Sequence, residues 1–503
     1  MMTRGFNTGG AALQRQTFED AALWGANNMR VHLKPISKIP AGDYWKAFEQ
    51  VENDAEKVVS NARGTGIKVI LTLGSFIPGV NRDKNEYWTH PDLEQYHVEA
   101  WRRIAKRVYP YRDSVYGYDL MNEPLDRSVA PRSPAQWREL AIKITSAIRE
   151  IDKDTWIIYE PGPGGTFAGF FDLEPLPDTK VIYSGHYYFP HMFTHQGIWN
   201  VKNTELTQAM TKVNIPYPLP VEDLKRDTWE LSYHRLPDLN VFDKETIAKI
   251  AAPAIAFQKK YNVPIYLGEF SVIRWAPKEA GLRYLNDLIE FWESQGWSWS
   301  YHAFREYNGW SLEYADAMDW IEGMPVPPMA TYLTDRAKLV LGYLKRNELP
   351  KQNIGAIETF IAEKAAANRK NESGEYAFSF ATKADTSVWS ATSSTTMSVK
   401  GEGTSAVLEI TGTTWDSKIY RGVKLQTGTY RLSVEAGGLL TVYINKSGNW
   451  KSQDNALKWN NTPMTKADKV FTVDGGAYTI VAHIAGATGT ASLRSITLSK
   501  QDK

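Results

Sequence analysis

The sequence reads Tyr118-Asp-Leu-Met-Asn-Glu-Pro124 in one place and Pro264-Ile-Tyr-Leu-Gly-Glu-Phe270 in another. Each stretch is a short apolar run, typical of a strand, that leads into a glutamate, Glu123 in the first and Glu269 in the second. A carboxylate at the end of a buried strand is poorly placed for a structural surface charge. Two carboxylates on either side of a sugar linkage are what glycosidic-bond hydrolysis needs. We therefore expect an enzyme that cuts polysaccharides.

The segments around these stretches alternate short apolar runs with amphipathic helical patterns. Strands are predicted at Arg4–Thr8, Asn28–Leu33, Ile67–Leu73, Val115–Met121, Thr155–Glu160, Lys180–His186, Pro264–Gly268 and Trp297–His302. Helices are predicted at Asp43–Asn61, Glu94–Val108, Pro134–Glu150, Lys244–Tyr261, Glu279–Gln295 and Thr334–Arg346. Eight strands alternating with helices within residues 1–346 predict an α/β fold, a (β/α)8 TIM barrel. A doubly wound sheet also alternates, but no Gly-rich phosphate turn follows the first strand.

The connection between the sixth and seventh strands is unusually long for a barrel. It contains several prolines and aromatic residues, and we expect it to decorate the mouth of the barrel. Endo or exo action would depend on whether segment 190–243 closes the cleft.

Composition changes after Arg346. Residues 347–372 are polar, with one helical patch at 354–367, and are expected to form a linker. Residues 373–503 are rich in Ser, Thr and Gly, with strict alternation at 430–434 and closely spaced turn signals. This pattern predicts a smaller all-β sandwich domain after the barrel.

Composition excludes some classes of function. The chain has 503 residues and a formal net charge of +1, and no basic patch indicates a nucleic-acid partner. It has no cysteine, so neither a disulfide nor a thiolate metal site is expected. No apolar run is long enough to predict a membrane span. No signal peptide is visible, although Met1 could stand in place of a leader.

Five segments, in order along the chain, resemble glycoside hydrolase family 5, in the clan of (β/α)8 retaining glycosidases. They are Arg4-Gly-Phe-Asn7, Ala26-Asn-Asn-Met-Arg-Val31, Asn122-Glu-Pro124, His186-Tyr-Tyr188 and Gly268-Glu-Phe270. Each lies on or at the end of a predicted barrel strand, and the resemblance covers about residues 3–345. One such motif alone is a weak signal, whereas five in order are a strong one.

The resemblance implies a double displacement with retained anomeric configuration. Glu123 would be the general acid and base, and Glu269 the nucleophile that attacks the anomeric carbon. Four residues would support them: Arg30 and Tyr188 on the oxygens of Glu269, Asn122 on the sugar 2-hydroxyl, and His186 on the floor of the site. No cofactor and no metal are implied.

Two positions depart from the family pattern. The third strand ends in Gly74, where many members carry a histidine. His302 stands where the eighth strand usually carries a tryptophan under the cleaved sugar, and Phe304 or Trp310 would supply the platform instead. These changes leave the sugar open: a β-1,4-glucan is the first expectation, which makes the chain an endoglucanase (cellulase), and mannan or another β-glycan is the alternative.

Other interpretations remain at this point. Glu123 could cap a helix, and Glu269 could form a structural ion pair with Arg30. A metal enzyme could use His186, His191 and His195, although their spacing is not a zinc signature. A catalytically inactive carbohydrate binder is a further alternative, which activity on any β-glycan would exclude.

The C-terminal domain carries aromatic residues that suit a carbohydrate-binding module, namely Trp389, Trp415, Trp450 and Trp459. Of these, Trp415, Trp450 and Trp459 are the candidates for a second sugar site; the alternative is that they fill the domain core. The expected partner is a β-linked polysaccharide or oligosaccharide. The resemblance further implies a monomer that is secreted or periplasmic.

Overall fold

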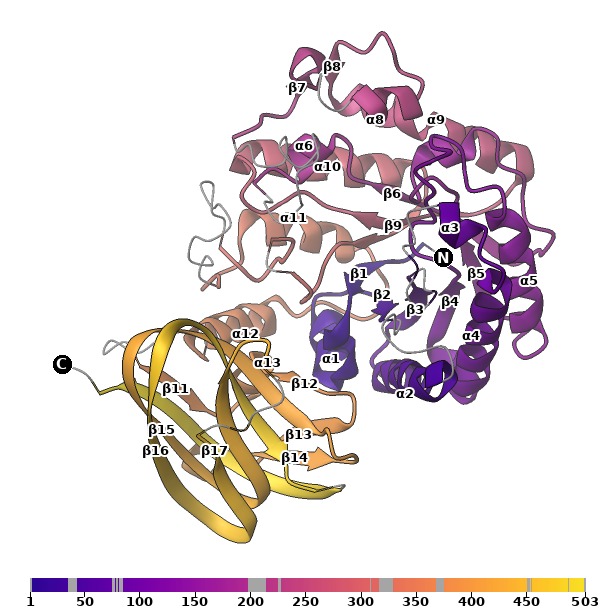
Figure 1. The fold of residues 1–503 in the computed structure, drawn as a ribbon. Helices are drawn as coiled ribbons and strands as arrows, with labels where there is room; N and C mark the ends of the chain where they lie inside the picture. Colours follow the sequence, from indigo (N-terminus) through magenta and orange to yellow (C-terminus); the bar gives the residue numbers. More distant parts are fainter. Residues whose placement is uncertain are drawn as a thin grey trace. The chain divides into compact units, whose positions relative to one another are not determined.

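Eight parallel strands close into a barrel in the first part of the chain, as predicted (Figure 1). They are β1 (Arg4–Thr8), β2 (Asn28–Leu33), β3 (Lys68–Leu73), β4 (Val115–Asp119), β5 (Trp156–Tyr159), β6 (Val181–Tyr187), β9 (Ile265–Phe270) and β10 (Ser298–Tyr301). The barrel closes where β1 pairs with both β2 and β10. Each strand lies where the sequence predicted it, with small differences at the ends.

The computed structural model describes residues 2–34, 43–74, 77, 80, 85–197, 214–224, 228–307, 309–315, 329–367, 375–449, 453, 455–486 and 488–501. The chain divides into two units. The barrel unit comprises Met1–Pro328 and Leu333–Ile354, and the C-terminal unit comprises Met329–Tyr332 and Gly355–Lys503.

The barrel strands form because they are buried on both faces. Every residue of β1, β6 and β9 is buried. A barrel strand faces the packed interior on one side and the helices on the other, so strands such as β3 and β9 are mostly apolar, whereas β1 and β2 also carry buried polar residues. Since all eight strands run the same way, their carboxyl ends meet at one rim, and active sites of this fold lie at that rim.

The described residues of the barrel unit form ten α-helices: α1 (Arg15–Leu23), α2 (Tyr44–Ala62), α3 (Asn85–Trp88), α4 (Leu93–Val108), α5 (Trp137–Arg149), α6 (His191–Thr194), α8 (Thr228–Tyr233), α9 (Lys244–Tyr261), α10 (Lys278–Ser294) and α11 (Asp335–Leu344). The six predicted helices, which are α2, α4, α5, α9, α10 and α11, lie close to their predicted ranges. Short 3-10 helices lie at η1 (Gly10–Leu13), η3 (Tyr109–Ser114), η4 (Phe167–Phe170) and η5 (Val221–Leu224). The sequence analysis predicted neither the short helices α3, α6 and α8 nor α1, which has nine residues and no side-chain cap at Gln14.

Tryptophan serves mainly as core material in the barrel unit. Eight described tryptophans are fully buried there: Trp24, Trp88, Trp101, Trp137, Trp275, Trp292, Trp297 and Trp299. Phe167, Trp292 and Trp297 stack with interplanar angles of 14–15°. The high aromatic content therefore reflects a large core, in which each ring removes much apolar surface from water.

The long connection between β6 and β9 contains α6, η5, α8, α9 and a small antiparallel pair, β7 (Leu219–Pro220) with β8 (Val241–Phe242). Its first residues lie beside the barrel rim, because the ring of His195 packs against Tyr188 and Trp310. Buried Glu230, in α8, binds the backbone and ring of His191 and so joins α8 to α6.

The C-terminal unit is the predicted all-β domain. Its strands are β11 (Tyr376–Ser379), β12 (Ser390–Ala391), β13 (Thr395–Lys400), β14 (Val407–Gly412), β15 (Lys418–Lys446), β16 (Leu457–Ile484) and β17 (Gly489–Lys500), and all pairings are antiparallel. The strand β15 bends so far that Lys418 and Thr441 both pair with His483 of β16. The curled sheet encloses one apolar core.

Three short helices complete this unit: α12 (Ile354–Ala367), α13 (Lys383–Ser387) and η6 (Gly403–Ser405). The range of α12 agrees with the helical patch predicted at 354–367. Across the described ranges of both units, no helix combines the length and apolar character that a bilayer span requires.

Candidate active site

The two glutamates that the sequence singled out meet at the carboxyl ends of the barrel strands. Glu269 is the fifth residue of β9, and Glu123 follows four residues after the end of β4. Carboxylate oxygens of Glu123 and Glu269 lie within 4.8 Å of each other. The side chain of Glu269 is 8% exposed and that of Glu123 is 33% exposed, so Glu123 lies nearer the solvent.

Arg30, from β2, is the centre of the polar network below the two glutamates. Its guanidinium is fully buried and donates to Asp119, Glu160 and Glu269, each at 2.7 Å. It also donates to the side-chain oxygen of Asn122 at 3.0 Å. Burial disfavours the charge of Arg30, but the three carboxylates more than offset it and hold its pKa well above the usual value.

The pKa values of the three acidic groups around Arg30 are shifted in different directions. Burial, with Glu160 as a near neighbour, raises the pKa of Asp119 well above its usual range. Burial also acts on Glu160, but the charges of His186 and Arg30 outweigh it and lower the pKa. The pKa of Glu269 lies well below the usual value, because His186, His302 and a hydrogen bond from His32 outweigh its burial. Glu160 and Glu269 are therefore ionised at neutral pH.

His186 connects Glu123 to this network. Its Nδ1 lies 3.0 Å from Oε1 of Glu123, and its Nε2 lies 3.2 Å from Oε1 of Glu160. Burial lowers the pKa of His186, but Glu160 and Glu269 raise it more, and the result is well above 6.5. The imidazole is thus charged at neutral pH, and both of its nitrogens face carboxylates.

Glu160 also fixes the backbone at Glu123. Glu123 has a φ of 52°, in the left-handed region that non-glycine residues rarely adopt, and its N–H donates to Oε2 of Glu160 at 2.8 Å. Strained backbone of this kind persists only where the surroundings hold it, and it clusters at functional sites. The fully buried carboxylate of Glu160 therefore positions Glu123 by two routes, through its backbone and through His186.

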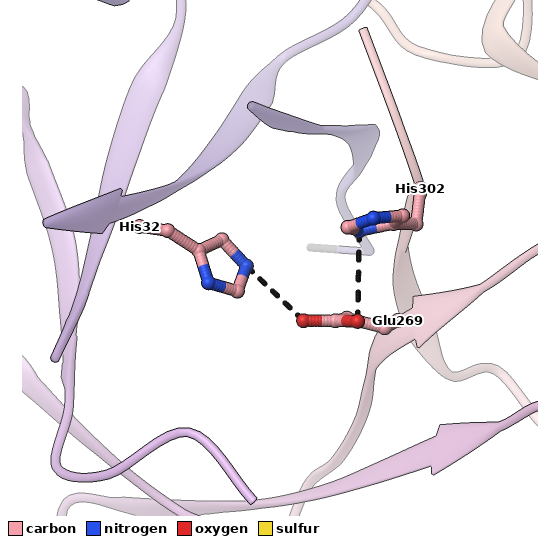
Figure 2. A group of neighbouring side chains, drawn as sticks. All are labelled: His32, Glu269 and His302. Atoms are coloured by element: carbon pink, nitrogen blue, oxygen red, sulfur yellow. Dashed lines mark ion pairs between the residues drawn. The ribbon is translucent and has the colours of Figure 1, made fainter. Parts of the chain in front are cut away.

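Three further side chains contact Glu269. Tyr188, which directly follows β6, donates its hydroxyl to Oε2 at 3.0 Å. His32 Nε2 lies 3.1 Å from Oε1, and His302 Nδ1 lies 3.5 Å from Oε2. Figure 2 shows the two imidazoles approaching Glu269 from different strands. The predicted residues Arg30, Tyr188 and His302 are thus brought together around one carboxylate.

The two aromatic residues expected near the site lie in different surroundings. Trp310 is 7% exposed and its ring packs at the rim, 6.0 Å from Tyr188 and 6.1 Å from His302. Phe304 is 1% exposed and stacks on Phe6 within the core. The prediction of Phe304 as a sugar platform was wrong, because its ring has no face open to a ligand.

The candidate second sugar site in the C-terminal unit also needs correction. Trp459 is 2% exposed, belongs to the core, and donates its indole N–H to Thr465. Trp389 is 4% exposed in the same core, and Trp450 lies outside the described residues. Trp415 is 75% exposed. Trp459 is therefore excluded as a stacking surface, and Trp415 alone of the three candidates is described as accessible.

The sequence analysis missed Asp119, Glu160 and His32. Asp119 lies inside the first stretch quoted above. Glu160 follows the apolar run of β5, so the pattern that identified Glu123 and Glu269 applies to Glu160 as well. His32 lies within β2, two residues after Arg30, and so on the same side of the strand; the sequence analysis did not use this spacing.

Two groups of His and acidic side chains within the described ranges bring potential ligand atoms within 4.8 Å of one another. They are His32, Glu269 and His302, and Glu123, His186 and Glu269. Neither group is the set of His186, His191 and His195 that the sequence analysis considered for a metal enzyme. Within the described ranges, His191 and His195 belong to no such group, although their rings stack on each other.

Two glutamates at the rim of a (β/α)8 barrel, over a buried arginine, form an arrangement that suits glycoside hydrolysis. The family model of cellulase (glycosyl hydrolase family 5) matches residues 2–308. The chain belongs to this family.

Among curated proteins, Endoglucanase C of Acetivibrio thermocellus is 29% identical over 227 residues, which are 43% of this chain and 63% of that protein. Cellodextrinase A of Ruminococcus flavefaciens is 22% identical, over 56% of this chain and 76% of its own length. The chain thus spans less than two thirds of the length of the first of these relatives.

Solved structures support the fold. A hyperthermophilic endo-β-1,4-glucanase in complex with substrate matches 68% of this chain and 97% of its own, with a TM-score of 0.50 and 22% identity. A structure described as a glycoside hydrolase matches 68% of this chain and 99% of its own, with a TM-score of 0.52 and 18% identity. At these identities the likeness concerns the barrel fold alone.

The network predicts a pH-dependent effect of Glu160→Gln on stability. The substitution removes a fully buried charge that Arg30 and His186 face, so the free energy of unfolding should fall by about 3–5 kcal/mol near pH 6. Folding raises the pKa of His186, so its stabilising contribution is complete below the unfolded pKa of about 6.5 and is lost as pH rises through the raised pKa. The difference in the free energy of unfolding between the wild type and Glu160→Gln should therefore become smaller at alkaline pH. Urea unfolding at several pH values would measure it.

Glu174→Gln is the matched control, because the side chain of Glu174 is 75% exposed and lies 3.9 Å from Arg138. It should change the free energy of unfolding by less than about 0.5 kcal/mol at any pH. A deficit in Glu160→Gln that is equally small, or that does not vary with pH, would contradict the network described here.

Proposed function

We propose that this chain is a retaining β-glycoside hydrolase, and in particular an endo-β-1,4-glucanase. The observation that carries the proposal is the approach of Glu123 and Glu269, whose oxygens lie within 4.8 Å at the barrel rim. Retaining enzymes keep their two carboxyl groups about 5–5.5 Å apart, whereas inverting enzymes leave about 6.5–9.5 Å for a water molecule. The short separation favours direct attack by one carboxylate over attack by water.

Glu269 suits the role of nucleophile because it is ionised and held from several sides. Arg30 and Tyr188 donate to its two different oxygens at 2.7 and 3.0 Å, which fixes the plane of the carboxylate. In the first step an oxygen of Glu269 forms a bond to the anomeric carbon while the bond to the leaving oxygen breaks. The product is a glycosyl ester of Glu269, and its anomeric configuration is inverted relative to the substrate.

Glu123 suits the role of acid and base because its carboxyl group is more exposed than that of Glu269, on the open side of the rim, and Nδ1 of His186 orients it at 3.0 Å. In the first step it gives its proton to the leaving oxygen. In the second step it takes a proton from a water molecule, whose oxygen attacks the same carbon and releases Glu269. The two inversions give net retention, and each proton that Glu123 donates is recovered.

Asn122 and Trp310 complete the proposed sugar site. The side-chain oxygen of Asn122 accepts from Arg30, which leaves the amide nitrogen to donate to the sugar 2-hydroxyl. Trp310 lies at the rim beside His302 and provides apolar surface for a sugar ring. His302 stands where family members usually place the stacking tryptophan, so it would replace stacking by a polar contact.

A β-1,4-linked glucan is the proposed substrate, since the curated relatives named above are an endoglucanase and a cellodextrinase. Mannan is the alternative to test first, because the departures at Gly74 and His302 concern residues around the cleaved sugar. Purified protein assayed on soluble β-glucans, mannan and xyloglucan, with product sizing, would decide between them. We further propose that the protein acts as a secreted or periplasmic monomer, where such polymers are accessible.

Substitution of the glutamates tests their roles. Glu269→Ala should abolish turnover of every substrate, because no covalent intermediate forms. Glu123→Ala should lose less activity on an aryl glycoside with a good leaving group, which needs little acid assistance. Added azide should partly restore turnover of Glu123→Ala and yield a β-glycosyl azide, which mass spectrometry and NMR would identify.

Glu306→Ala serves as the control, since Glu306 is an exposed acid to which the mechanism gives no role. It should keep most of the wild-type activity. If the two catalytic variants lose activity equally on the aryl glycoside and azide restores neither, the assignment of acid and nucleophile is wrong.

We also propose that the C-terminal unit binds carbohydrate through Trp415. An exposed indole covers the apolar face of a sugar ring at low entropic cost, and a tethered second site raises the local concentration of an insoluble chain. In the full chain carrying Glu269→Ala, Trp415→Ala should weaken binding to insoluble cellulose or mannan roughly fivefold, which corresponds to about 1 kcal/mol. A depletion assay measures this binding.

Tyr332→Ala is a suitable control, because Tyr332 is an exposed aromatic residue of the same unit, 64% accessible. It should bind both polymers like the parent. Unchanged binding in Trp415→Ala on both polymers would leave the unit with a structural role.

A further inference from the structure

Two imidazoles and one carboxylate converge at the floor of the candidate active site. His32 comes from β2, Glu269 from β9, and His302 directly follows β10. Figure 2 shows both rings with a nitrogen directed at Glu269. One ligand atom from each of the three side chains lies within 4.8 Å of the other two.

The spacing of these atoms is close to that of a coordinated zinc ion. Zinc bonds of about 2.0–2.2 Å to nitrogen or oxygen, in a tetrahedral shell, place ligand atoms about 3.3–3.6 Å apart. Here Nε2 of His32 lies 3.1 Å from Oε1 of Glu269, and Nδ1 of His302 lies 3.5 Å from Oε2. Small rotations of the side chains would bring the three ligand atoms around one ion.

Each imidazole can present a lone pair to an ion. Nε2 of His32, which lies 3.1 Å from Oε1 of Glu269 and 2.9 Å from Nη1 of Arg30, does so in the tautomer that carries its proton on Nδ1. Nδ1 of His302 is buried and finds no hydrogen-bond partner among the described residues, since its distance to Glu269 is too long for a well-formed bond. A buried polar atom without a partner is costly, and a ligand that supplies one is favoured.

Arg30 opposes a cation at this place, because its guanidinium lies 2.7 Å from Glu269. The same guanidinium is also bound by Asp119 and Glu160, so its charge is shared among three carboxylates. This competition weakens the site relative to a dedicated zinc centre, and we expect an affinity in the micromolar range.

We propose that His32, Glu269 and His302 form an inhibitory site for a borderline-soft divalent metal ion, such as Zn²⁺ or Cu²⁺. Two imidazoles with one carboxylate select such ions over Mg²⁺ and Ca²⁺, which prefer oxygen ligands. The fourth position of the ion is left for water. With an oxygen of Glu269 bound to the metal, its lone pair is unavailable, so that the carboxylate no longer serves as a nucleophile.

Binding and inhibition are separate claims, and the inhibition alone rests on the proposed function. The binding is tested by calorimetric titration of the full chain, first cleared of metal with a chelator, with ZnCl₂ in the absence of substrate. One ion should bind per chain, and an equal concentration of MgCl₂ should give no heat of binding. His32→Asn and His302→Asn should each weaken zinc binding at least tenfold.

Two further variants distinguish this group from other histidines. His90→Gln, which lies outside both candidate groups, should bind zinc like the wild type. His186→Asn removes the imidazole of the other group and should also retain the site. Unchanged zinc binding in His32→Asn and His302→Asn, or loss of binding in His186→Asn alone, would overturn the proposal.

Should a variant fail to fold, the wild-type chain still decides the question. Crystals soaked in ZnCl₂ should show an anomalous peak among His32, Glu269 and His302, and a peak found solely elsewhere would contradict the assignment. Inhibition is then measured on a β-glucan: Zn²⁺ should raise the apparent KM and a chelator should restore the rate. If the chain binds zinc here but hydrolyses no glycan, the proposed function fails and the metal site stands.

Discussion

Arg30 lies fully buried in the barrel and donates to Asp119, Glu160 and Glu269 at 2.7 Å each. A buried charge is costly unless it is paired and fully hydrogen-bonded, and here three carboxylates from three strands meet that requirement. The arrangement fixes the distances between β2, β4, β5 and β9 at their carboxyl ends. Since Glu160 in turn holds the backbone of Glu123, the position of both rim glutamates depends on this one guanidinium.

The same network gives the rim glutamates different chemistry. Glu269 is held from below and from the sides by Arg30, Tyr188 and two histidines, which keeps it ionised in spite of its burial. Glu123 contacts one charged histidine and otherwise faces the solvent. The two carboxyl groups lie close together, but one is enclosed by positive charge and the other is more open. This difference in surroundings assigns the nucleophile to the first and the acid and base to the second. The histidines that stabilise the charge of Glu269 are also the ones that would let a metal ion bind it.

The barrel was predictable because strands such as β3, β5 and β9 are buried on both faces and leave short apolar runs in the sequence, which alternate with amphipathic helices. The site was predictable where such a run leads into a glutamate, and Glu160 follows this rule although the analysis did not apply it to β5. Side-chain direction was predictable only in part. Trp459 lies on the inner face of its strand, as the alternation Leu457-Lys-Trp-Asn460 indicates, although the analysis did not apply that alternation. Phe304, two residues past His302, lies beyond the end of β10 and turns into the core against Phe6, and there packing across the fold decided where the ring points.

The stereochemistry of hydrolysis tests the central claim most directly, because the separation of the two carboxyl groups determines it. Proton NMR of a soluble β-1,4-linked oligosaccharide during the first minutes of hydrolysis distinguishes the anomers before they equilibrate. With Glu269 as nucleophile and Glu123 as acid and base, the first sugar released should carry the β-configuration. Release of the α-anomer would mean that water attacks directly, and would contradict the double displacement on which this account rests.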